Sequence, residues 1–191
     1  MSITAIVAIS CVVLFFVFYG MYTNVIKAKN KVEEAYSGID VQLKKRYDLI
    51  PNLLTIAKTF MEHEKEVFTK ITELRTAALK LSDNFSDINK KIELEKEIRN
   101  QMSKFMVSVE NYPQLKSDAT MAEAMKAYQD IEEHLSAARR FYNSAVYQLN
   151  NMVEIFPSSI IAAMCNIQKC KFFEADEAEK KPVNASDYFN K

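Results

Sequence analysis

The stretch Ile3–Tyr22, ITAIVAISCVVLFFVFYGMY, decides the organisation of this chain, because it contains no charged side chain. At about 1.5 Å of helical rise per residue it spans roughly 30 Å, the thickness of the hydrocarbon core of a membrane. Its apolar residues show no helical period, as is typical of a helix that is apolar on all sides. The sequence therefore predicts a transmembrane anchor over residues 1–23, in contact with the bilayer through residues 3–22.

A cleaved signal peptide is the main alternative to a retained anchor. Such a peptide has a basic region before a shorter apolar core and a small-residue cleavage site after it. Here only the α-amino group precedes the apolar run. The residues before Cys11 weakly resemble a lipoprotein cleavage site, but the apolar run continues to Phe18. We therefore favour a retained anchor.

Lysines on one side of the anchor predict its orientation. Lys27, Lys29 and Lys31 follow the apolar run directly, and no basic side chain precedes it. Because basic flanks stay inside the cell, we expect the N-terminus outside and the rest of the chain in the cytoplasm. Three lysines at this position can also attract anionic lipid headgroups, at about 1 kcal/mol each. They are equally compatible with simple orientation signals on a solvated helix face.

The composition of the chain narrows the classes of function. After the anchor, the 191-residue chain leaves one domain of ordinary size, and its 25 basic and 25 acidic residues balance. No basic cluster alternates with aromatic residues, so we expect no nucleic-acid partner. Cys11, Cys165 and Cys170 match neither a disulfide framework nor zinc-ligand spacing, which agrees with a reducing cytoplasm.

The rest of the chain has the pattern of an all-α protein. This part of the sequence contains one glycine, Gly38, and its apolar residues recur at helical spacing. We expect an antiparallel up-and-down bundle of about four long helices over residues 24–173, followed by an acidic and poorly ordered tail over residues 174–191. The first apolar seam comprises Val25, Val32, Ile39, Leu53, Phe60, Val67, Leu74 and Leu81. The second comprises Tyr36, Leu43, Ile50, Ala57, Ile71 and Ala78.

The prolines and turn-forming residues indicate where the helices end. Pro51 is compatible with a kink in a long helix, with a turn at 48–51 or with a turn at 61–64. A turn is expected at 82–87, and a third helix from Ile88 ends near Pro113. Ser117 or Asp118 can cap the last long helix, which we expect to reach Phe156. Its seam comprises Met121, Tyr128, Leu135, Tyr142, Leu149 and Phe156.

A short apolar segment follows Pro157, from Ile160 to Phe173. It can lie on the bundle, meet a partner or touch the membrane. Its weak amphipathic pattern and only two nearby lysines, Lys169 and Lys171, do not discriminate between these positions. We favour packing on the bundle.

The sequence lacks the motifs that most enzymes use for their chemistry. The two histidines, His63 and His134, have no glutamate three residues before them, as the metal sites of di-iron bundles require. The sequence has no glycine-rich phosphate loop and no GxSxG motif. We therefore expect no metal, no cofactor and no enzymatic activity.

One stretch, Asp40–Leu53, places charge inside an apolar seam. Arg46 occupies a seam position, and a buried guanidinium must be paired, so we expect a carboxylate partner: Asp48 nearby, or Glu132 or Glu133 on the last helix. Such a pair can fix the register of the helices. Alternatively, Arg46, Asp48 and Arg139 or Arg140 can line a polar groove for a ligand or peptide.

The same stretch carries a resemblance to the LemA family. The segments that resemble it are 30–35 (NKVEEA), 39–44 (IDVQLK), 48–53 (DLIPNL), 112–116 (YPQLK), 138–146 (ARRFYNSAV), 156–162 (FPSSIIA) and 172–174 (FFE). Taken with the polar stretch, these motifs mark ten residues as candidates for an interaction site. They are Asp40, Gln42, Lys44, Arg46, Asp48, Pro51, Asn52, Arg139, Arg140 and Asn143.

The resemblance implies a bacterial protein that crosses the cell membrane once and has a cytoplasmic helical bundle. It implies no enzyme activity. Some family members occur beside a membrane zinc metalloprotease and some in magnetosome formation, which favours a membrane-protein partner, including such a metalloprotease. Our leading hypothesis is a non-enzymatic scaffold or adaptor that presents the Asp40–Asn52 region, or the segment after Pro157. The alternative is a ligand-sensing or enzymatic bundle that uses the polar groove around Arg46, Asp48 and Arg139.

Overall fold

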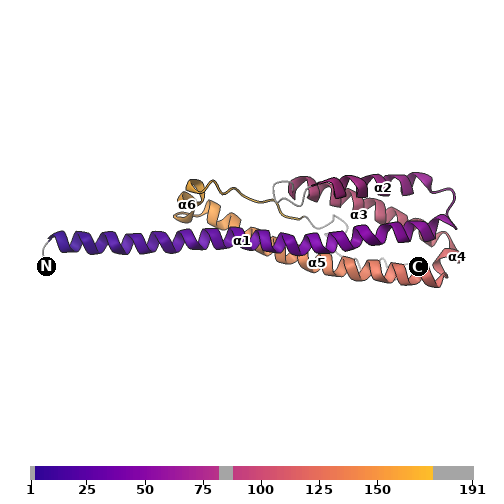
Figure 1. Ribbon diagram of the computed structural model, residues 1–191, viewed down its shortest axis with the longest axis horizontal. Helices are drawn as coiled ribbons and strands as arrows, with labels where there is room; N and C mark the ends of the chain where they lie inside the picture. The colour runs from indigo at the N-terminus through magenta and orange to yellow at the C-terminus, as the bar shows by residue number, and fades with distance from the viewer. Residues whose placement is uncertain (1–2, 82–87, 174–191) are drawn as a thin grey trace, which may run out of the picture.

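The computed structural model describes residues 3–81 and 88–173, and this part of the chain forms six helices without a strand. The predicted all-α fold is confirmed. Four long helices, α1 (Ile3–Lys58), α2 (Lys65–Lys80), α3 (Ile88–Glu110) and α5 (Ala119–Glu154), run alternately up and down (Figure 1). Two short helices, α4 (Pro113–Lys116) and α6 (Ser158–Met164), complete the fold. The expected turn at 82–87 and the tail at 174–191 lie outside the described residues.

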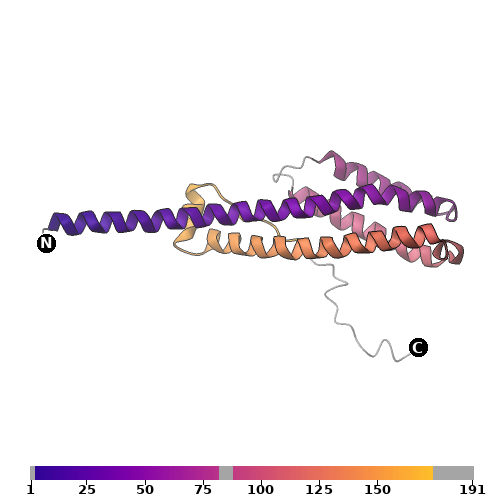
Figure 2. The same ribbon diagram turned by 60° about the horizontal axis from the view of Figure 1, so that its bottom comes forward.

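Helix α1 combines the predicted anchor and the first helix of the bundle. It is a single helix of 56 residues, and its N-terminal part extends beyond the other helices (Figure 2). Among the described residues, α1 is the helix that is long and apolar enough to cross a membrane, and its most apolar window is entirely unburied. The expected boundary between anchor and bundle, at residues 23 and 24, therefore lies within a continuous helix.

Pro51 lies inside α1 and does not end it. Because proline has no N–H, it cannot donate to the carbonyl of Tyr47 four residues earlier. Arg75 of α2 supplies the missing donor, with its Nε 2.6 Å from the oxygen of Tyr47. Helix α1 continues to Lys58, and the turn to α2 occupies 59–64, which agrees with the later of the two expected turn positions.

Apolar seams hold α1 and α5 together along most of the bundle. Five of the six predicted seam residues of α5 are buried. The side chain of Asp118 caps α5 by accepting a hydrogen bond of 2.8 Å from the N–H of Met121. The prediction that α5 reaches Phe156 and buries it was wrong. Helix α5 ends at Glu154, and Phe156 is 75% exposed, because a residue that precedes proline disfavours the helical conformation.

The chain after Pro157 packs on the bundle, as we favoured. Ile161 and Ala162 of α6 are buried in a small cluster with Val25 of α1. Beyond α6 the chain returns along the bundle without regular structure, and Phe173 is buried in the main core. The other face of the α5–α6 corner is uncovered. Its exposed apolar side chains are Ile155, Phe156, Ile160 and Met164.

Candidate functional site

Arg46 lies at the centre of an ion cluster that joins three helices. The cluster comprises Arg46 of α1, Glu95 of α3 and Glu132 of α5, and Arg46 is 0% exposed. Its Nη1 donates to Glu132 Oε1 at 2.8 Å, and its Nη2 pairs with Glu95. The expectation that Arg46 pairs with a carboxylate, with Glu132 among the candidates, is therefore confirmed.

The two other predicted partners do not take part in the ion cluster. Asp48 and Glu133 are both exposed, because each lies on the outward side of its helix. The second carboxylate partner of Arg46 is Glu95, and the side chain of Glu95 is 0% exposed. The sequence did not reveal this partner, since Glu95 stands in a run of charged residues that has the pattern of a solvated face.

Two tyrosines lie next to the residues of the ion cluster. The hydroxyl of Tyr47 donates to the second carboxylate oxygen of Glu95, so that both oxygens of this buried carboxylate are used. Burial raises the pKa of Tyr47 to about 12, against the opposing effect of the charge on Arg46. Burial also raises the pKa of Tyr128 on α5, which neighbours Arg46 and Glu132. Both phenols therefore stay protonated at neutral pH and can donate hydrogen bonds.

The charges of Arg46 and Glu132 stabilise each other against the cost of burial. Burial has the largest single effect and lowers the pKa of Arg46, but the charge and hydrogen bond of Glu132, with the neighbouring Tyr128 and Tyr47, together outweigh it and leave the pKa above its ordinary value. Burial likewise raises the pKa of Glu132, and the charge and hydrogen bond of Arg46 outweigh it, so that the pKa is lowered. Both groups are therefore ionised around neutral pH.

A second polar pair lies on the same side of α1. Asp40 accepts from Lys91 of α3, and the ammonium group of Lys91 lies 5.7 Å from the ring centre of Tyr36. Burial has the largest single effect and lowers the pKa of Lys91, but the hydrogen bonds and charges of Asp40 and Tyr36 together outweigh it, and the pKa is raised. Asp40, a predicted site residue, therefore connects α1 with α3.

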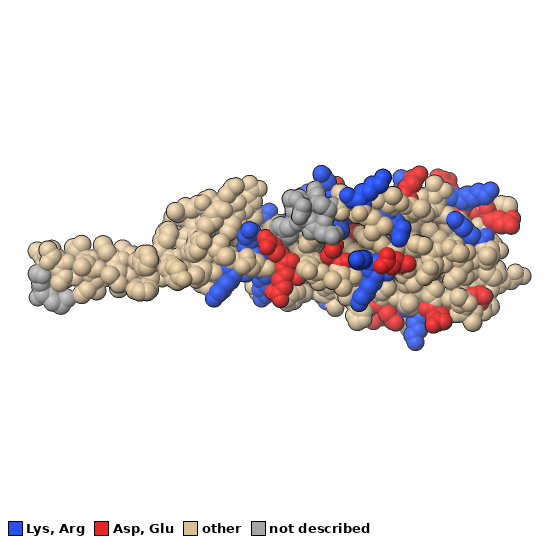
Figure 3. Space-filling view, viewed as in Figure 1, with Lys and Arg blue, Asp and Glu red and all other residues tan. Residues whose placement is uncertain are grey.

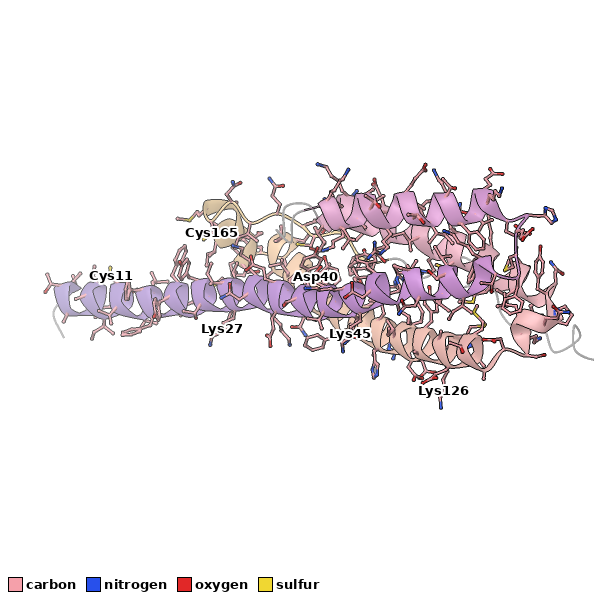
Figure 4. All side chains as sticks on the ribbon, turned by 45° about the vertical axis from the view of Figure 1, so that its right-hand side comes forward. Cys11, Lys27, Asp40, Lys45, Lys126 and Cys165 are labelled. Atoms are coloured by element: carbon pink, nitrogen blue, oxygen red, sulfur yellow. The ribbon has the colours of Figure 1, made fainter. Side chains whose placement is uncertain are left out.

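The remaining predicted residues of α1 point elsewhere. Lys44, Asp48 and Asn52 are exposed along one face of α1, whereas Gln42 and Pro51 are half-buried. In Figure 4, Lys45 lies on the opposite side of α1 from Asp40. The candidate residues between 40 and 52 therefore lie on two faces of α1. One face enters the core, and the other is free in the described part of the chain.

The three predicted residues of α5 have different environments. Arg139 is half-buried, and its charge contributes to the lowered pKa of Glu132. Arg140 is exposed and donates to Ser136 on the same helix at 3.4 Å. The side chain of Asn143 exchanges two hydrogen bonds with the backbone of Phe173, at 2.8 and 2.9 Å. Of the proposed groove residues, Arg46 and Arg139 both contribute to the lowered pKa of Glu132, whereas Asp48 and Arg140 are exposed.

Asn150 repeats the role of Asn143 one heptad later. Its side chain exchanges hydrogen bonds of 3.0 and 2.9 Å with the backbone of Cys170. Tyr142 adds a hydrogen bond from its hydroxyl to the carbonyl of Lys171, at 3.1 Å. The seven-residue spacing of the two asparagines was a signal for this arrangement. Together these side chains hold residues 170–173 against α5.

The structure places its large open groove away from the candidate residues. The groove has a volume of about 1090 Å³ and runs from Lys58 at the end of α1 along one face of α2 to Lys80. None of the ten candidate residues lines it. Among the described residues, no group of three or more histidine, cysteine or acidic side chains is placed to hold a metal ion.

Fold and site together define a class of helical-bundle protein in which a candidate membrane span continues into the bundle and a buried ion cluster joins the helices. Within this class the chain belongs to the LemA family, whose family model matches residues 35–186. The chain is similar to "Protein LemA" of Metamycoplasma hominis, with 24% identity over 178 residues that cover 93% of this chain and 80% of that protein. The family expected from the sequence motifs is therefore confirmed.

Proposed function

We propose that this protein is a membrane-anchored, non-enzymatic adaptor that presents the outward face of α1 to another membrane protein. The observation that best supports this proposal is the continuity of α1, from the exposed apolar run to the core of the bundle. A continuous helix has no linker at which the bundle could swing freely. The bundle would therefore hold one fixed face toward its neighbours in the membrane.

The orientation of the protein follows from its lysines under this proposal. Lys27, Lys29 and Lys31 are exposed just beyond the apolar run. By the positive-inside rule the bundle lies in the cytoplasm and the N-terminus outside. The same lysines lie where anionic headgroups would attract them, at about 1 kcal/mol each. Lys29 also pairs with Glu33 at 3.5 Å on the helix surface, which leaves less of its charge for lipid.

The outward face of α1 is the surface that we assign to the partner. Its exposed residues recur every three or four positions and so form one stripe along the helix. They are Val41, Lys44, Lys45, Asp48 and Asn52. The stripe mixes both charges with an apolar side chain that is half exposed. The complete burial of Arg46 supports a structural role for the ion cluster and speaks against a ligand groove.

A matched pair of variants tests the proposal. The first, Lys44→Glu/Asp48→Lys/Asn52→Ala, alters the stripe at constant net charge. The control, Lys96→Glu/Glu93→Lys/Asn100→Ala, makes the corresponding charge reversals and truncation on the exposed face of α3. After cross-linking of the full chain in its native membrane, we expect the first variant to lose a membrane-protein partner that the wild type and the control retain. Equal helix content by circular dichroism excludes unfolding, and retention of the partner by the first variant contradicts the proposal.

A further inference from the structure

We infer that the α5–α6 corner, residues 155–164, inserts into the polar–apolar boundary of the bilayer beside the span. This inference rests on the membrane anchoring in the proposed function. It assigns a second membrane contact to the bundle, formed by a segment that lies more than 130 residues from the span in sequence.

The corner exposes a concentration of large apolar side chains. Phe156 is 75% exposed and Met164 is 72% exposed, and Ile155 and Ile160 are about half exposed. No charged residue occurs from Ile155 to Gln168. Contiguous exposed apolar surface of this kind marks a contact with a membrane or a partner.

The packing of α6 places this surface at the end of the span. Ile161 and Ala162 of α6 are buried against Val25, and Met21 packs on the same cluster. Since the apolar run ends at Tyr22, α6 lies within about one helical turn of that end. Figure 1 shows α6 alongside the part of α1 that leads into the exposed span. A bilayer that surrounds the span therefore reaches the level of the corner.

The distribution of charge favours the bilayer over a protein partner as the occupant. On the face that Figure 3 shows, the exposed apolar run and α6 itself carry no charged side chain, and the first blue side chains lie at the edge of the α6 region that faces the bundle. The nearest charges in the sequence agree with this boundary: Lys27 follows the span, and the corner is flanked by Glu154 and Lys169, which pair with each other. Apolar surface bounded by charged side chains is typical of elements that bury about 5–10 Å into the headgroup region.

The experiment uses tryptophan as a probe, because the chain contains none. Three single variants of the full chain are reconstituted in liposomes of phosphatidylcholine and phosphatidylglycerol. Phe156→Trp reports on the corner, Phe16→Trp on the span, and Val107→Trp on an exposed site of α3. Emission is compared in ordinary lipids and in lipids brominated high on the acyl chain. Iodide in the buffer measures exposure to water, and Met164→Trp repeats the test at a second corner position.

We expect Phe156→Trp to emit at shorter wavelength than Val107→Trp and to lose most of its emission in brominated lipids. If Phe16→Trp is quenched by lipid while Phe156→Trp and Met164→Trp are quenched only by iodide, the protein is anchored and the inference is overturned. If the corner probes are quenched by neither, a second copy or another protein covers them, and the bilayer is not the occupant. If Phe16→Trp also escapes lipid quenching, the anchor itself fails, and the inference fails with it.

Discussion

The α1–α5 pair and the α2–α3 hairpin share one apolar core, but they differ in how closely their backbones approach and in the polar contacts that join them. Helices α1 and α5 lie side by side over most of the bundle, with apolar seams between them. The backbones of α2 and α3 approach each other closely but come near α1 or α5 at few points. Polar contacts connect the hairpin to α1 there: Arg46 with Glu95, Asp40 with Lys91, and the Tyr47 carbonyl with Arg75.

Apolar and polar contacts contribute differently to the stability of this fold and to the placement of its helices. Apolar burial stabilises in proportion to area and tolerates small shifts along a seam. A buried ion pair gains little net stability, because desolvation offsets the attraction, but a displaced pair leaves a charge uncompensated. We therefore interpret the apolar seam as the main source of stability. The polar contacts fix where the hairpin lies along α1.

The largest effect is expected when the ion cluster is broken. Arg46→Met leaves Glu95 buried without its cation, and we expect a loss of about 3–5 kcal/mol in the free energy of unfolding. Urea unfolding of the full chain in mild detergent measures this loss. Hydrogen exchange should show faster amide exchange in α3 than in α5, because the hairpin loses its fixed position first.

Two further variants sharpen this result. Arg46→Met/Glu95→Leu removes both buried charges and should recover most of the lost stability. Leu149→Ala in the apolar seam of α5 should cost about 2–5 kcal/mol and accelerate exchange in α1 and α5 instead. An equal acceleration in all four long helices for both single variants would contradict the distinction between the two regions.

Acid should weaken the ion cluster before it affects the seam. The pKa of Glu132 is lowered from its ordinary 4.5 in the folded protein, so the unfolded chain binds the proton more readily. The resulting stability is present above pH 4.5 and is lost as the pH falls through the lower folded pKa. Glu132→Gln should cost about 2 kcal/mol at neutral pH and flatten this acid dependence, as urea midpoints at several pH values can show. Glu133→Gln, on the exposed neighbour, is the control and should change neither quantity.

The contact between Arg75 and α1 should matter only because of Pro51. Arg75→Ala leaves the Tyr47 carbonyl without a donor, and we expect a loss of about 1–2 kcal/mol. Pro51→Ala restores the N–H that completes the helix, so that Arg75→Ala should cost less in the Pro51→Ala background. A double-mutant cycle on urea midpoints measures this coupling. Additive losses would show that the two residues act independently.

The sequence predicted which faces of the helices are buried but not which helices they meet. The seven-residue period placed Ile39, Leu43 and Ile50 inside, and all three are buried. The requirement that Arg46 be paired gave three candidate partners, of which Glu132 is confirmed. Periodicity says nothing of the neighbour across the core, however, so Glu95 and Lys91, which lie in a charged run, were missed. The donor from Arg75 was missed for the same reason, since Pro51 marks the carbonyl that lacks a helical donor but not the residue that supplies one.

The smallest effect is expected where α5 holds the returning chain. Asn143→Ala removes both hydrogen bonds to Phe173, and we expect a loss of about 1 kcal/mol or less, because the segment is short and can be solvated. The local effect should be larger than the global one: the Phe173 amide should exchange faster with solvent, while the Cys170 amide, held by Asn150, should be unchanged. Asn150→Ala should give the reverse pattern. If either variant releases both amides together, residues 170–173 behave as one cooperative unit, and the two asparagines do not act as separate contacts.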